Sequence, residues 1–198
     1  MTKSVDFYFD FGSPAAYLAA TQLPHVCADT GAELVWKPML LGGVFQATGN
    51  HSPAEIKPKG PYMTADLQRF ARRYGVPYVH NPFFPVNTLL LMRGATGIQM
   101  TEPARFGAYV DAVYHAMWVE PQNLNDPATV GAVLQNAGFD AAVLLALAGA
   151  QDTKDRLKAV TQEAVERGVF GAPTMFVGTE MFWGQDRLDF VREALAAA

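Results

Sequence analysis

The first forty residues restrict the possible folds of the chain most, because a strand pattern there is broken by the Gly-Ser-Pro sequence at residues 12–14. Residues 5–11 alternate apolar and polar side chains, which is the period of a β-strand. Serine followed by proline is typical of a helix start, and this helix is expected to run to about Asp29 and stop at Gly31. Residues 32–37 alternate again. The unit predicts two parallel strands with a right-handed crossover.

The last thirty residues carry a different arrangement. A turn is predicted at residues 170–173, and residues 174–177 and 180–183 predict two strands joined as a hairpin. Residues 184–186 then open a final helix.

Between the two ends the pattern is mostly helical. Acidic residues followed by proline recur at the expected helix starts, as the helix dipole favours. The expected helices lie within residues 53–74, 87–98 and 103–118, open at residues 126 and 140, and span 152–167. Residues 42–60 are rich in glycine and proline and predict an irregular loop.

Together these patterns predict an α/β protein with a four-stranded mixed sheet built from both chain ends. We expect residues 1–43 and 166–198 to form the domain that contains this sheet. Residues 44–165 are expected to form an inserted, all-helical domain.

Composition excludes several other classes. The chain has 198 residues, 50% hydrophobic and 17% charged, which is too apolar for disorder. Its single cysteine excludes a disulfide framework, a thiolate zinc site and a C-x-x-C redox pair. A net charge of −4 gives no electrostatic reason to expect a nucleic acid or an anionic membrane as partner. The aromatic share of 12% fits an apolar pocket, a subunit interface or simply a well-filled core.

Targeting, metal and nucleotide signals are not found in the sequence. Residues 1–10 lack a signal-peptide pattern, and the longest apolar run, residues 141–150, is about half of what crosses a bilayer, so we expect a cytoplasmic protein. The four histidines have no metal-ligand spacing, so no metal is expected. Neither a P-loop nor G-x-G-x-x-G nor G-x-S-x-G occurs.

Two local motifs could carry chemistry. Ser13 lies at a strand-to-helix junction, where free backbone N–H groups and the helix dipole stabilise an anion such as a thiolate. Pro173 directly precedes a strand, and prolines there are often cis, which would leave the backbone of Ala172 able to pair with an extended peptide. Taken singly, the first motif is better explained as a plain helix cap and the second as an ordinary turn.

The two motifs occur together, and this combination resembles the thioredoxin fold with Ser-Pro where redox enzymes carry C-x-x-C. Residues 9–19, 169–176 and 182–188 are similar to 2-hydroxychromene-2-carboxylate isomerases, which are related to kappa-class glutathione transferases. The similarity extends through residues 49–60 and 62–77 and so spans nearly the whole chain.

The resemblance implies reduced glutathione as cofactor. Ser13 would hold its sulfur as the thiolate, and Ala172 before Pro173 would pair with its cysteinyl part. Gln185 and Asp186 would hold the γ-glutamyl end, whose ammonium needs a carboxylate partner. Trp183 and Gly184 of the same motif would also contact the cofactor. Asn50 and Lys59 would lie near the tripeptide, with Lys59 facing a carboxylate. Asp186 is also explained as a first-turn acid, Lys59 as a solvated lysine and Asn50 as a turn residue.

The implied reaction is cis–trans isomerisation of an aromatic 2-oxo acid by thiolate addition, bond rotation and elimination. An aromatic pocket would enclose the substrate; its candidates are Phe45, Tyr62, Phe83, Phe84 and Asn87. The resemblance also implies a homodimer. A kappa-type transferase or peroxidase, and a non-catalytic thiol- or peptide-binding protein, remain open alternatives.

Overall fold

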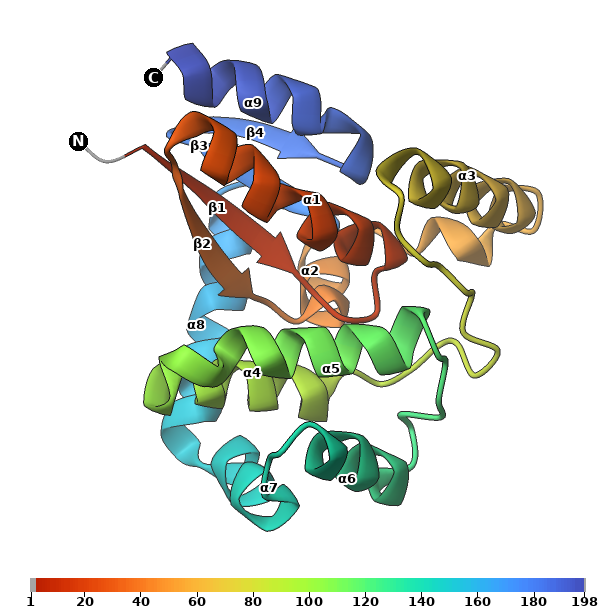
Figure 1. Cartoon of the computed structure of the whole chain (residues 1–198), viewed down its shortest axis with the longest axis vertical. Helices are drawn as coiled ribbons and strands as arrows, with labels where there is room; N and C mark the ends of the chain where they lie inside the picture. The colour runs from red at the N-terminus through yellow and green to blue at the C-terminus, as the bar shows by residue number, and fades with distance from the viewer. Residues whose placement is uncertain (1–2, 198) are drawn as a thin grey trace.

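A computed structural model describes residues 3–197 as a β-sheet with helices on both faces (Figure 1). The strands are β1 (Ser4–Phe9), β2 (Glu33–Pro38), β3 (Thr174–Val177) and β4 (Glu180–Trp183). The helices are α1 (Pro14–Thr30), α2 (Leu41–Thr48), α3 (Lys59–Tyr74), α4 (Leu89–Thr101), α5 (Phe106–Trp118), α6 (Pro127–Asn136), α7 (Ala141–Gly149), α8 (Gln151–Glu166) and α9 (Leu188–Ala197). Short 3₁₀ turns are η1 (Pro53–Glu55), η2 (Pro103–Arg105) and η3 (Gln185–Arg187).

The sheet has the strand order β2-β1-β3-β4, which confirms the predicted four-stranded mixed sheet. The first strand pairs in parallel with β2, so that Phe7 lies beside Trp36. It pairs antiparallel with β3, where Phe7 lies beside Met175, and β3 continues antiparallel into β4. The two ends of the chain therefore meet in the middle of one sheet.

The first helix has the expected boundaries. Ser13 is extended at the N-cap, and its side chain accepts a hydrogen bond from the amide of Ala16. Pro14 occupies the first turn, where no amide partner is needed. Gly31 ends the helix in the left-handed conformation at φ 66°, which costs glycine little because it has no Cβ.

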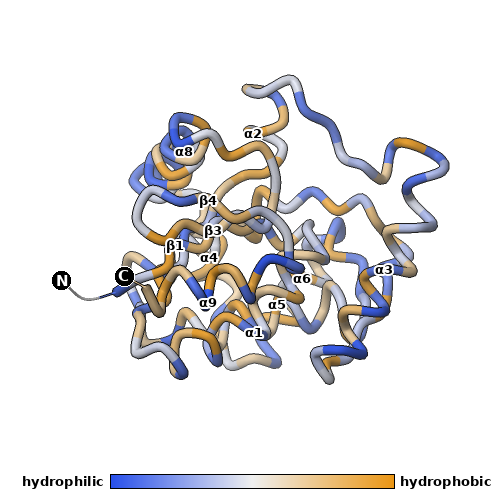
Figure 2. The backbone as a smooth tube through the Cα atoms, turned by 90° about the horizontal axis from the view of Figure 1, so that it is seen from above, coloured by the Kyte–Doolittle hydropathy of each residue, from blue (hydrophilic) through white to orange (hydrophobic). Residues whose placement is uncertain are grey.

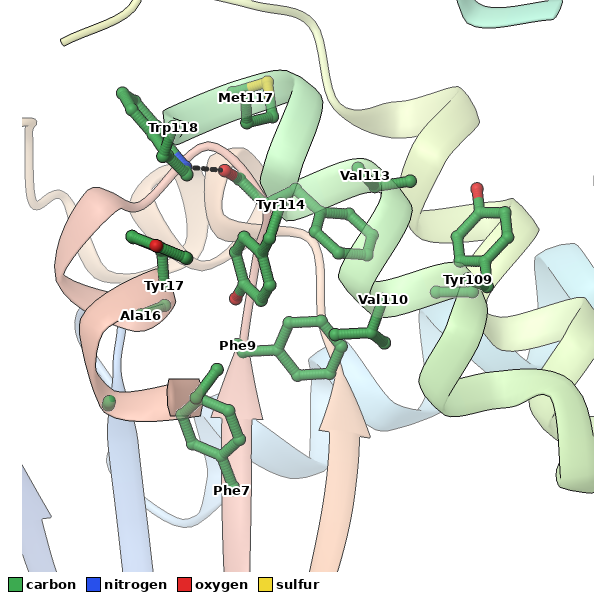
Figure 3. Close-up of a cluster of buried hydrophobic side chains, with 14 of the residues drawn as sticks. Phe7, Phe9, Ala16, Tyr17, Tyr109, Val110, Val113, Tyr114, Met117 and Trp118 are labelled. Carbon is green, nitrogen blue, oxygen red and sulfur yellow. Dashed lines mark hydrogen bonds between the residues drawn. The ribbon is translucent and has the colours of Figure 1, made fainter. Parts of the chain in front are cut away.

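Both faces of the central strand are buried. On one face, Phe7 and Phe9 pack towards α5, where Tyr114 and Val110 complete a cluster of rings and branched side chains (Figure 3). Trp118 Nε1 donates to the carbonyl oxygen of Phe11 at 2.9 Å and so ties α5 to the segment after β1 (Figure 3).

The opposite face of the sheet packs against α8. Figure 2 shows the strands between α8 on one side and α1 with α9 on the other. Tyr8 is fully buried there, and its hydroxyl donates to Glu163 of α8 at 2.5 Å. All of α8 except its last residue, Glu166, lies within residues 44–165, so the sheet's second core draws on the inserted segment. The two-domain division remains a prediction.

Helices α4, α5, α6 and α7 lie below the sheet in Figure 1, whereas α3 lies to the right of α1. Helix α4 packs against α5, α7 and α8, and α6 packs against α5 and α7. No single helix within residues 3–197 is long and apolar enough to cross a membrane, although α6 and α7 together, bent by 120°, have the length and composition.

The prediction of an irregular loop over residues 42–60 is wrong for its first half. Helix α2 occupies Leu41–Thr48. Its start is held from outside the segment, because the Leu41 amide donates to Asp10 at 2.8 Å and the Leu40 amide donates to Thr161 at 3.0 Å. These tertiary contacts outweigh the low helix propensity of its glycines.

Candidate functional site

A groove of about 1000 Å³ lies beside the end of β1. One wall is made by Ser13, the turn at residues 170–172 and residues 183–186. It is called the thiol wall here, after the role that the sequence analysis predicts for Ser13. The facing wall, here called the aromatic wall, is made by α2, by α3 and by residues 80–88.

Ser13 stands at the centre of the thiol wall and is 6% exposed. Its Oγ accepts from the Ala16 amide at 3.1 Å and donates to the carbonyl oxygen of Ala172 at 2.9 Å. The hydroxyl thus links the helix start to the turn before β3. It also lies at the positive end of a 17-residue helix, where an anion is stabilised.

The turn before β3 presents backbone to the groove. The Ala172–Pro173 peptide bond is cis, as expected, and Ala172 lines the groove while Pro173 lies buried behind it. A Cβ on Gly171 would lie 2.6 Å from Trp183 Nε1, so glycine is required where the Trp183 ring closes over the turn. The ring of Trp183 also packs on Phe170 at 5.1 Å.

The turn after β4 carries the acidic group of the site. Gly184 has φ 104°, and a Cβ there would meet Asp186 Oδ1 at 2.5 Å. The Asp186 carboxylate pairs with Arg187 at 2.8 Å, with both side chains partly exposed. The carbonyl oxygen of Gln185 accepts from the Tyr74 hydroxyl at 2.6 Å, which ties α3 to this turn.

Asn50 and Lys59 both line the groove, and their predicted contact with the tripeptide stays a prediction. The Asn50 side-chain amide donates to the carbonyl oxygen of Phe170 at 2.7 Å, so it closes the loop after α2 onto the thiol wall. Lys59 begins α3 and forms no ion pair with any residue of the described part of the chain. It is therefore the lysine in this groove that can meet a carboxylate.

Asp10, which the sequence analysis did not single out, lies buried at the floor of the groove. Its two oxygens accept from the amides of Gly12 and Leu41, each at 2.8 Å, and the Thr88 side chain adds a third hydrogen bond. Burial raises the pKa of this carboxyl, against the opposing effect of those hydrogen bonds. Asp10 thus joins the Ser13 turn, α2 and the start of α4.

The aromatic wall contains two of the five predicted substrate residues. Phe45 and Phe84 line the groove. Tyr62 is 64% exposed on α3 with Arg69 over its ring, and Phe83 is 46% exposed on the loop. Asn87 accepts from the Leu89 amide at 3.1 Å near the start of α4. These three lie outside the groove lining, because helix and turn geometry aim neighbouring side chains in different directions.

Several residues of this wall were missed, above all His80, which lines the groove. It was considered only as a metal ligand, and its place after Tyr78 in an aromatic and proline-rich stretch was the available signal. The remaining apolar lining of this wall comes from Met63 and Leu67 of α3, with Pro85 and Val86 of the loop.

The lone cysteine lies away from this chemistry. Cys27 is buried in α1, and burial raises the pKa of its thiol to about 11. A thiol of this kind is poorly nucleophilic at neutral pH. Within residues 3–197, no cluster of three or more His, Cys, Asp or Glu side chains could hold a metal ion.

Known proteins are similar to this chain in both sequence and fold. The family model described as "DSBA-like thioredoxin domain" matches residues 4–196. The 2-hydroxychromene-2-carboxylate isomerase of Sphingobium xenophagum is 34% identical over 98% of this chain and 99% of that protein. A solved structure of a 2-hydroxychromene-2-carboxylate isomerase aligns with TM-score 0.86 at 34% identity, over 98% of this chain and 95% of that chain. Glutathione S-transferase kappa 1 of Homo sapiens is 25% identical over 98% of this chain and 92% of that protein.

Proposed function

The chain belongs to the DSBA-like thioredoxin family and within it to the 2-hydroxychromene-2-carboxylate isomerases, and from this premise we propose that it is a glutathione-dependent cis–trans isomerase. Its substrates would be 2-hydroxychromene-2-carboxylate and similar aromatic degradation intermediates, and its product trans-o-hydroxybenzylidenepyruvate. The observation that carries the proposal is Ser13, which faces Ala172 at the N-terminus of α1 where a redox enzyme would carry its own cysteine.

The groups of the thiol wall, together with Asn50 after α2 and Lys59 of α3, fit glutathione, an extended tripeptide with a thiol, two carboxylates and one ammonium. Ser13 and the start of α1 suit the thiolate, and the backbone of Ala172 suits the cysteinyl part. Asp186 suits the ammonium, for which it would exchange its pairing with Arg187. Lys59 suits a carboxylate, while Asn50, Gln185 and the Trp183 ring shape the space around the peptide.

When bound, glutathione would supply the thiolate that adds reversibly to the conjugated 2-oxo acid, so that the former double bond can rotate. The residues of the chain would hold and orient glutathione and the substrate. The Ser13 hydroxyl would turn its hydrogen from the Ala172 oxygen towards the sulfur. This hydrogen bond and the dipole of α1 would both lower the pKa of the glutathione thiol. The aromatic wall, with Phe45 and Phe84, would enclose the substrate and exclude water.

Binding of glutathione is the first test. We expect millimolar reduced glutathione to raise the Tm of the protein and S-methylglutathione to raise it much less, because the methyl group removes the charge that Ser13 holds. No change in Tm with reduced glutathione would contradict the proposal.

Turnover is the second test. With 2-hydroxychromene-2-carboxylate, we expect the substrate spectrum to change while total glutathione stays constant. Consumption of glutathione into a conjugate would instead support a kappa-type transferase, and binding without turnover would support a thiol-binding protein.

A homodimer and a cytoplasmic location are the further proposals that accompany this function.

A further inference from the structure

His80 is a titratable side chain in the groove. It has no role in the proposed binding of the glutathione thiolate. It lines the same groove as Ser13, but it belongs to the aromatic wall. Its ring packs against Phe84, with centroids 5.9 Å apart, and against Trp118 of α5 at 6.2 Å. Phe84 lines the part of the groove where the proposed substrate would be enclosed, and Trp118 is buried behind that lining.

Tyr78 holds one nitrogen of this imidazole. The Tyr78 hydroxyl lies 3.3 Å from His80 Nδ1, and Nε2 forms no hydrogen bond with any residue between 3 and 197. Burial raises the pKa of Tyr78 to about 12, so the phenol stays uncharged at neutral pH. In the tautomer that carries its hydrogen on Nδ1, the imidazole donates to the Tyr78 oxygen and keeps the lone pair of Nε2. This arrangement, a ring nitrogen held by a partner while the other stays available, is typical of an oriented acid–base group.

The other ionisable groups of the groove are already engaged or lack a lone pair. Both oxygens of Asp10 accept backbone hydrogen bonds, and Asp186 pairs with Arg187. Lys59 as an ammonium donates but cannot accept a proton. Among the lining residues that the structure describes, His80 is therefore the group best placed to take and return a proton.

The surroundings of the ring favour its neutral form. The imidazole of His80 is exposed towards the groove on one side, and partial burial against its neighbours lowers its pKa below the ordinary value. The groups packed against it are Tyr78, Phe84 and Trp118, of which only the Tyr78 phenol titrates. At neutral pH the imidazole is thus uncharged, with a lone pair available for a proton.

We propose that His80 opens the ring of a substrate that arrives as the cyclic hemiketal of an aromatic 2-oxo acid. The inference rests on the proposed function, since a thiolate can add only to the open, conjugated form. Nε2 takes the proton of the hemiketal hydroxyl, and the electrons of that O–H bond form the ketone. The bond from this carbon to the ring oxygen breaks, its electron pair leaves on the phenolate, and the phenolate takes the proton back from His80. No proton or electron is gained or lost overall.

Ring opening can be measured without glutathione. Semicarbazide traps the open ketone of 2-hydroxychromene-2-carboxylate, so at high trap concentration the rate of trapping is the rate of opening. At saturating substrate, we expect the wild-type protein to accelerate trapping and His80→Gln to reduce that acceleration about 100-fold. His25→Gln, an exposed histidine of α1 outside the groove, is the control and should behave as wild type. No acceleration by the wild type, or equal acceleration by His80→Gln, would overturn the proposal.

The pH profile separates an acid–base role from a structural one. The wild-type acceleration should fall on the acid side as His80 becomes protonated, and this limb should be absent in His80→Gln. Tyr78→Phe keeps the imidazole and should keep the limb at a reduced rate. An acid limb that persists in His80→Gln would assign the titration to another group and overturn the role of His80.

The glutathione Tm shift keeps the two proposals distinct. It should be the same in His80→Gln and wild type, because His80 lies on the other wall. If the wild type shows no shift, the proposed function fails, while the trapping rates still decide whether His80 opens the ring.

Discussion

The two walls of the groove are built in different ways. The thiol wall is held by backbone: a helix start at Ser13, a cis peptide at Ala172–Pro173 and a positive-φ glycine at 184. The aromatic wall is held by side chains from α2, α3 and the loop at residues 80–88, which reach it from separate parts of the chain. In the proposed function, the first wall holds glutathione and the second wall encloses the substrate.

The largest effect is expected at the centre of the thiol wall. Ser13→Ala removes the hydroxyl that we propose donates to the glutathione thiolate, and kcat/KM should fall about 10²–10³-fold, as for loss of a donor to a developing anion. Kinetic assays at fixed glutathione measure this.

Loss of the helix cap is the competing explanation for such a fall. Asp140→Ala removes the N-cap of α7, far from the groove, and should cost about 1 kcal/mol of stability without changing kcat/KM. An equal loss of activity in both variants would show that Ser13 acts only as a cap.

A second substitution tests the aromatic wall. Phe84→Ala should raise KM for the substrate about tenfold while leaving glutathione affinity unchanged, since it removes apolar contact area on one wall only. Phe83→Ala, one residue earlier and outside the groove lining, should have little effect. If Phe83→Ala has the larger effect on KM, the assignment of the two rings is reversed.

A third substitution tests how the backbone positions the acid. Gly184→Ala introduces a Cβ that would meet Asp186 Oδ1, and the Kd of glutathione should rise about tenfold. Gly178→Ala, in the β3–β4 hairpin, also places alanine at a positive φ, with a smaller penalty because φ 59° lies in the left-handed helical region, and with open space around the added Cβ. Calorimetric titration should show weaker binding only in the Gly184 variant; equal weakening would trace the effect to lost stability.

The smallest effect is expected at the cysteine. Cys27→Ala should leave kcat/KM unchanged, because the buried thiol has a pKa of about 11 and lies outside the groove. The loss of stability should stay below about 2 kcal/mol. A large loss of activity, with the fold intact by circular dichroism, would mean that the chain supplies its own sulfur.

The same contrast explains what could be predicted from the sequence. The start of α1, its stop at Gly31 and the β3–β4 hairpin depend on local backbone preferences, so short motifs predict them well. Most residues of the thiol wall follow from those motifs.

The aromatic wall depends on contacts between distant segments. Helix α2 forms because Asp10 and Thr161 satisfy its start, which no pattern within residues 42–60 contains. Phe84 rather than Phe83 enters the groove, and His80 joins it, because of how the loop packs on α5. Sequence patterns suggest that this segment is aromatic but not which ring faces inward.

The ionisation of bound glutathione tests the central claim most directly. A pH titration of the thiolate ultraviolet absorbance, recorded on the wild-type complex and on the Ser13→Ala complex, measures the pKa of the bound thiol. We predict a thiolate at neutral pH in the wild-type complex and a thiol in the variant. Equal pKa values in two complexes that both bind glutathione would contradict the role assigned to Ser13.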